Sequence, residues 1–322
     1  RELFRQLAKS ADMVLETFPP GFLEGLGLGY EDLRGSNPRL VFTSISDFGQ
    51  TGPHRSFRSS DMVASALGGW MYVTGEEEDP PVKLAGSQAH MMASTYAAVS
   101  SMIALYRGAI TGVGQHVDIS LEEAAVSVSH ICGVGKWLDD GIIPRRRGTG
   151  LFASVPSGAY PCTDGMVYLM VNRPLHWQAL ARWISEVTGN QEVLDPMFEG
   201  PSSTRQPYRE LLDIFISDLT SQFTVEEIYH EGQRRHIAFT PVNTAAAVAQ
   251  DGHLVERNYF VDLEHPGVGT LRYPGPAYRH SATPWRIACP APAVGEHNRE
   301  IYREELGVNE ERLRALQEAG VI

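Results

Sequence analysis

The sequence has little positive charge and few cysteines. Of its 322 residues, 27 are Lys or Arg and 39 are Asp or Glu, which gives a formal net charge of -12. A chain with this acidic balance is not expected to bind nucleic acid or an anionic membrane surface. The three cysteines, Cys132, Cys162 and Cys289, are far apart and odd in number. We therefore predict free thiols and a reducing, cytoplasmic location.

Several signatures of other protein classes are also missing. The 11 histidines are scattered, and neither His-x-His nor C-x-x-C spacing occurs, so no metal site is predicted. The sequence has no G-x-S-x-G nucleophile elbow, and its Gly112-Val113-Gly114 turn lacks the rest of a phosphate-binding motif. The apolar run 89–107 is interrupted by Ser, Thr and His, which favours a buried helix over a membrane span. No signal peptide or membrane span is predicted.

The hydrophobic pattern predicts an α/β fold. Residues 13–16 and 40–45 are apolar enough for buried strands, and each run is followed by a loop rich in Gly and Pro. The stretch 82–118 adds a loop, a buried helix, a glycine turn and a third strand. Such an order predicts a wound parallel sheet, which binds ligands at the loops that follow its strands. Further along, 224–227 reads Thr-Val-Glu-Glu, the capping box of a helix.

Seven short motifs follow one another in a recognisable order. They are Phe18-Pro19-Pro20-Gly21, 44–53 (SISDFGQTGP), 112–118 (GVGQHVD), 160–165 (YPCTDG), 241–244 (PVNT), 264–267 (EHPG) and 295–297 (GEH). This ordered set resembles the class III CoA-transferases, which include formyl-CoA transferase, carnitine CoA-transferase and, by fold, α-methylacyl-CoA racemase.

The resemblance implies both an architecture and an activity. The expected fold is an α/β protein with a Rossmann-like large domain and a smaller α+β domain, assembled as an interlaced dimer. The expected reaction moves CoA between an acyl-CoA and a carboxylic acid, with CoA as a substrate and no permanently bound cofactor. Family members begin before the position of Arg1, so we expect that the first βα unit is missing. We assign 1–143 to the large domain, 144–152 to a linker, 153–271 to the small domain and 272–322 to a C-terminal return to the large domain.

One position departs from the family. The transferases carry a nucleophilic aspartate at the start of the buried helix, and counting back from Gly112 places His90 there. An imidazole cannot carry CoA as the family's aspartyl thioester does, but it suits acid-base catalysis near neutral pH. His90 is therefore a candidate catalytic base, with a purely structural hydrogen-bonding role as the alternative. Gln88, two residues earlier in the same loop, is a candidate CoA contact.

Other candidate CoA contacts lie in the loops after the first two strands. The family holds adenine and phosphates at Thr17 and Phe18, usually with Asn at position 17 and arginines at the positions of Pro19 and Gly25. Phe18 remains available for stacking, whereas the loss of both arginines predicts weaker CoA binding. Arg58 matches a basic residue that meets a CoA phosphate, and the alternative is an ordinary surface arginine.

Three functions remain open at this point. The favoured one is a CoA-transferase chain, either as a homodimer or as the subunit that lacks the nucleophile beside a catalytic paralogue. The second is a lyase, isomerase or thioesterase that uses His90 as its base, and the third is a non-catalytic CoA-binding subunit. Racemisation is not favoured, because Ser60 stands where the racemases carry a histidine base and His90 replaces their aspartate.

Overall fold

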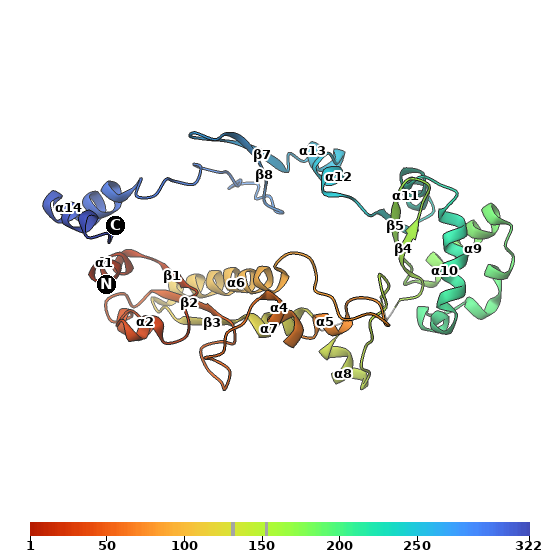
Figure 1. Ribbon diagram of the computed structural model, residues 1–322, viewed down its shortest axis with the longest axis horizontal. Helices are drawn as coiled ribbons and strands as arrows, with labels where there is room; N and C mark the ends of the chain where they lie inside the picture. The colour runs from red at the N-terminus through yellow and green to blue at the C-terminus, as the bar shows by residue number, and fades with distance from the viewer. Residues whose placement is uncertain (130–132, 152–153) are drawn as a thin grey trace. The chain divides into compact units, whose positions relative to one another are not determined.

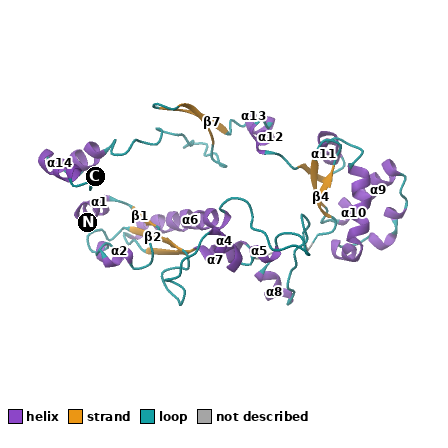
Figure 2. Cartoon of the chain, viewed as in Figure 1, coloured by secondary structure: helices purple, strands orange, loops and turns teal. Residues whose placement is uncertain are grey.

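The computed structural model describes residues 1–129, 133–151 and 154–322 (Figure 1). Contacts divide the described chain into two units, Arg1–Val242 and Asn243–Ile322. Helices and strands occur in both units (Figure 2), so the predicted α/β class is confirmed. The Rossmann-like detail, the interlaced dimer and the domain boundaries stay predictions. The boundary at 152/153 and the predicted free thiol of Cys132 lie outside the described residues.

A parallel sheet organises the first part of the chain. It has the order β1-β2-β3, with Met13 opposite Val41 and Phe42 opposite His116. Its strands are β1 (Met13–Glu16), β2 (Val41–Ser46) and β3 (His116–Ser120). The first four residues of β2 are buried, because β2 pairs on both edges and α6 (Gln88–Thr111) packs against it.

The helix α6 packs against the parallel sheet. Its buried residues are small, including Ala89, Ala93, Ala97 and Ala104, so the helix lies close to the sheet. Gly112 ends the helix in the left-handed region at φ +73°, as the glycine turn predicts. The other helices that precede β4 are α1 (Glu2–Ser10), α2 (Phe22–Gly25), α3 (Tyr30–Leu33), α4 (Asp61–Leu67), α5 (Trp70–Val73), α7 (Leu121–Val128) and α8 (Val134–Asp140).

A separate antiparallel sheet with its own core follows in the chain. Its strands, in the order β4-β5-β6, are β4 (Ser157–Pro161), β5 (Met166–Met170) and β6 (Ala238–Pro241). Its helices are α9 (Pro174–Thr188), η1 (Glu192–Leu194), η2 (Pro196–Phe198), η3 (Ser202–Tyr208), α10 (Arg209–Thr220) and α11 (Val225–Arg234). Trp177 and Trp183 are each 1% exposed in this core. The predicted capping box is confirmed, since Thr224 and Glu227 each accept a hydrogen bond from the other's backbone N–H.

The second unit contains short helices and one small sheet. Its elements are α12 (Ala245–Ala249), α13 (Gly252–Glu256), β7 (Phe260–His265), β8 (Gly269–Pro274), the π-helical turn η4 (Arg299–Glu305) and α14 (Glu310–Glu318). β7 and β8 form a two-stranded antiparallel sheet. Among the described residues of both units, no helix has the length and apolar character needed to cross a membrane.

Candidate functional site

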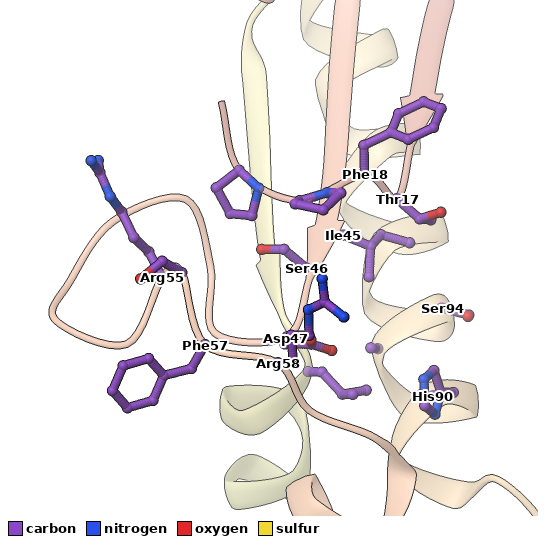
Figure 3. A pocket seen from close by; sticks show the side chains of 15 residues that line it. Thr17, Phe18, Ile45, Ser46, Asp47, Arg55, Phe57, Arg58, His90 and Ser94 are labelled. Atoms are coloured by element: carbon purple, nitrogen blue, oxygen red, sulfur yellow. The ribbon is translucent and has the colours of Figure 1, made fainter. Parts of the chain in front are cut away.

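A cavity of about 580 Å³ lies where the strands β1 and β2 end. Its lining residues are Thr17, Phe18, Pro19, Pro20, Ile45, Ser46, Asp47, Arg55, Ser56, Phe57, Arg58, His90, Ala93, Ser94 and Leu121 (Figure 3). The carboxyl ends of neighbouring parallel strands meet at one edge of a sheet, and open α/β sheets bind ligands at that edge. The first turns of α6 close the cavity with His90 and Ser94.

The cavity brings four of the five predicted site residues together. Thr17, Phe18, Arg58 and His90 all line it, although they come from three different parts of the chain. Gln88 does not line it, because its side-chain amide donates to the carbonyl of Ala85 at 2.9 Å instead. Four of the five candidates thus line one cavity, whereas Gln88, the first residue of α6, contacts the loop that precedes the helix.

Phe18 forms an aromatic wall of the cavity. Its side chain is 48% exposed, and its ring centroid lies 4.8 Å from that of Phe22. The backbone N–H of Phe18 donates to Oε2 of the buried Glu16 at 2.6 Å, which fixes the loop directly after β1. A half-exposed ring on a fixed loop is suited to stack against a flat ligand such as a nucleotide base.

A basic loop faces the cavity from the end of β2. Arg55 and Arg58 lie on it, and neither forms an ion pair with any described residue. The loop is fixed by carboxylates on both sides: Asp47 accepts a hydrogen bond from the N–H of Ser59 at 2.8 Å, and Asp118 accepts one from Gln50 at 3.0 Å. Two unpaired arginines on an anchored loop provide positive charge for a phosphate group.

His90 lies in the first turn of α6, and its side chain is 54% exposed. Its Nδ1 lies 3.2 Å from Oδ1 of Asp61, and its backbone N–H donates to the same oxygen, also at 3.2 Å. Asp61 is the first residue of α4 and is 9% exposed. Lys83 Nζ lies 3.0 Å from the other carboxylate oxygen of Asp61.

These contacts decide the charge of Asp61. Burial raises the pKa of its carboxyl, but hydrogen bonds from Lys83 and His90 outweigh burial and hold the pKa below its usual value. Asp61 is therefore an ionised carboxylate at neutral pH. The stretch Ser59-Ser60-Asp61-Met62 predicts only the start of a helix, with Ser60 or Asp61 as its cap, so sequence reasoning missed Asp61 as part of the site. The cap is in fact Ser60, which accepts a hydrogen bond from the N–H of Val63.

The arrangement offers acid-base chemistry but little nucleophilic chemistry. An imidazole held by a carboxylate can take up and return a proton at its other ring nitrogen. Within the described lining, Asp47 is the one carboxylate, and it is already bonded to the N–H of Ser59. No group of three or more potential metal ligands occurs among the residues that the structure describes.

Comparison with known proteins places the chain in a family. The model of CoA-transferase family III matches residues 1–298. Subunit BbsE of succinyl-CoA:(R)-benzylsuccinate CoA-transferase from Thauera aromatica is 35% identical over an alignment 317 residues long, which covers 94% of this chain and 75% of that protein. Succinyl-CoA–D-citramalate CoA-transferase from Chloroflexus aurantiacus is 32% identical over 322 residues, 99% of this chain and 79% of that protein.

The fold comparison agrees with the sequence comparison. The crystal structure of a CaiB/BaiF family protein from Brucella suis matches with a TM-score of 0.79 and 27% identity, over 94% of this chain and 78% of that one. The chain belongs to CoA-transferase family III, whose enzymes move CoA between an acyl-CoA and a carboxylic acid.

Proposed function

We propose that this chain is the subunit without the nucleophile in a two-chain CoA-transferase of the cytoplasm. An aspartate-bearing paralogue would carry the covalent step, and this chain would bind CoA or an acyl-CoA in the cavity after β1 and β2. The observation that carries the proposal is His90, which lies in the cavity where the family resemblance places the nucleophilic aspartate.

The chemistry of the lining supports a need for a partner. The family's CoA shuttle requires a free carboxylate that can form an anhydride and then a thioester. His90 has no carboxylate, Asp61 does not line the cavity, and Asp47 is bonded to the loop. A second chain that supplies the aspartate completes the reaction, and the relative from Thauera aromatica is itself named as a subunit.

The outer face of α6 supports a partner as well. Five apolar residues with helical spacing are each more than half exposed there: Val99, Met102, Ile103, Tyr106 and Ile110. A contiguous apolar stripe of this kind is typical of a surface that another protein covers. The stripe fits a homodimer or a heteromer, and the missing nucleophile favours the heteromer.

Within the cavity we assign roles to three of the predicted contacts. Phe18 stacks on the adenine of CoA, Thr17 contacts the adenine from the same loop, and Arg58 binds a phosphate of CoA. These assignments are supported by the common lining and by the free charge of Arg58. Gln88 and the domain boundaries at 143, 152 and 271 remain predictions.

A reconstitution assay tests the proposal. The chain, its aspartate-bearing paralogue and their mixture are each incubated with succinyl-CoA and a panel of carboxylic acids, and product acyl-CoA is measured by chromatography. We expect turnover in the mixture and none with this chain alone. Turnover by this chain alone that survives His90→Ala would contradict the proposal, because it would require another nucleophile within the chain.

A second function is favoured by one specific observation, the contact between His90 and Asp61. A carboxylate-held imidazole is a general base, so the chain alone could catalyse hydrolysis or proton removal on an acyl-CoA. Release of the CoA thiol without any acid acceptor, abolished by His90→Gln, would identify this activity. If no CoA thiol is released in this assay, the function remains that of a transferase subunit.

A further inference from the structure

We infer that Asp61 is a positioning residue that fixes the orientation and tautomer of the His90 ring. The inference rests on the second of the proposed functions only in taking His90 as the group that meets the substrate. It concerns a residue that lies outside the seven sequence motifs given above and that does not itself line the cavity.

The two carboxylate oxygens of Asp61 contact different residues. Oδ1 contacts both the backbone N–H and the ring Nδ1 of His90, each at 3.2 Å. Oδ2 contacts Lys83 Nζ at 3.0 Å. A carboxylate bonded on both oxygens cannot rotate freely, and it therefore holds the ring and the start of α6 in one mutual orientation.

Lys83 extends this arrangement to the loop before α6. Besides Asp61, its ammonium group donates to the carbonyl of Leu84 at 2.9 Å and to that of Gly86. Gly86 adopts φ +73°, a conformation that other residues rarely adopt, so the loop has a defined path into the helix. α4, the loop and α6 are thus joined around one nearly buried carboxylate.

The consequence for His90 is a defined tautomer. An ionised carboxylate only accepts hydrogen bonds, so the ring nitrogen that faces it must carry the proton. In the neutral ring Nδ1 is then protonated, and Nε2 keeps its lone pair. Nε2 has no hydrogen-bond partner among the described residues, so it is the nitrogen available to a substrate. Asp47, Arg55 and Arg58 are the charged groups that line the same cavity beside His90.

The ring nitrogens of His90 can be observed directly. Long-range ¹H–¹⁵N spectra of the full chain, assigned with His90→Gln, report which nitrogen carries the proton in the neutral ring. We expect Nδ1–H in the wild type. Asp61→Asn offers an amide N–H to Nδ1 and should move the proton to Nε2. In a Ser-His-Asp site the equivalent change reduces turnover by about 10⁴-fold, so a large loss in kcat with little change in KM is expected for any reaction that uses His90 as a base.

Two further variants make the test specific. Asp47→Asn removes the same charge from the cavity wall without touching His90, and it should leave the Nδ1–H tautomer unchanged. Asp61→Glu keeps a carboxylate and should restore Nδ1–H in part. The inference is overturned if wild-type His90 is an Nε2–H tautomer, or if Asp61→Asn leaves the ring spectrum unchanged. The spectra need no turnover, so this result is independent of whether the transferase proposal holds.

Discussion

Phe18→Ala is the substitution that most directly tests the assignment of the cavity to CoA. Stacking of a base on an aromatic side chain contributes about 1–3 kcal/mol, which corresponds to about 5–150-fold in Kd. Because Phe18 is 48% exposed, removal of its ring should cost the fold much less than the about 1.5–3 kcal/mol of a fully buried side chain. Affinity for CoA should therefore fall while the free energy of unfolding changes little.

The neighbouring ring provides a matched control. Phe22 is 47% exposed and contacts Phe18, but it does not line the cavity. Isothermal titration calorimetry with CoA, paired with urea unfolding, separates loss of binding from loss of stability. We expect Phe18→Ala to weaken CoA binding clearly more than Phe22→Ala does. Equal effects of the two substitutions, or no effect of either, would refute adenine stacking on Phe18.

Four further predictions concern charge, burial and pH. Arg58→Ala should weaken CoA binding about fivefold, because the contact of an exposed arginine with a phosphate contributes about 1 kcal/mol. Titrations at two ionic strengths should also show that CoA binding by the variant depends less on salt. Arg205→Met should lower the free energy of unfolding by about 3 kcal/mol in urea, since the buried guanidinium donates to three backbone carbonyls that would lose their partner. Burial raises the pKa of the Cys162 thiol to about 11, so mass mapping after thiol labelling at pH 8 should find the exposed Cys289 modified well before Cys162. Because the pKa of Asp61 is lowered from 3.8 by folding, its contribution to stability is complete above that pH and is lost as the pH falls through the lower folded value. The stability difference between wild type and Asp61→Asn should therefore shrink in acid unfolding experiments.

Much of the site could be predicted because its parts follow local rules. Thr17, Phe18 and Arg58 lie in loops that follow apolar strands, and parallel pairing brings such loops to one edge of the sheet. His90 could be placed from its spacing to Gly112, since the helix between them has a fixed rise per residue.

Two features of the site could not be predicted correctly from the sequence, namely the role of Asp61 and the position of Gln88. Asp61 is 29 positions from His90, and only the packing of α4 beside α6 brings the two together. No local sequence pattern contains that contact, because the residues around Asp61 indicate only the start of a helix. Gln88 is a different case: it precedes His90 by two residues, and side chains two apart on a helix do not share a face. Its absence from the lining follows from helix geometry.

The most direct test of the central claim is the intact mass of each chain after reaction. This chain and its aspartate-bearing paralogue are incubated separately and together with an acyl-CoA, treated with hydroxylamine and analysed by mass spectrometry with peptide mapping. Hydroxylamine converts an activated aspartate into a stable hydroxamate. We predict that the paralogue is labelled and that this chain is not. A hydroxamate on an Asp or Glu of this chain would contradict the account, because it would show that the chain carries its own nucleophile.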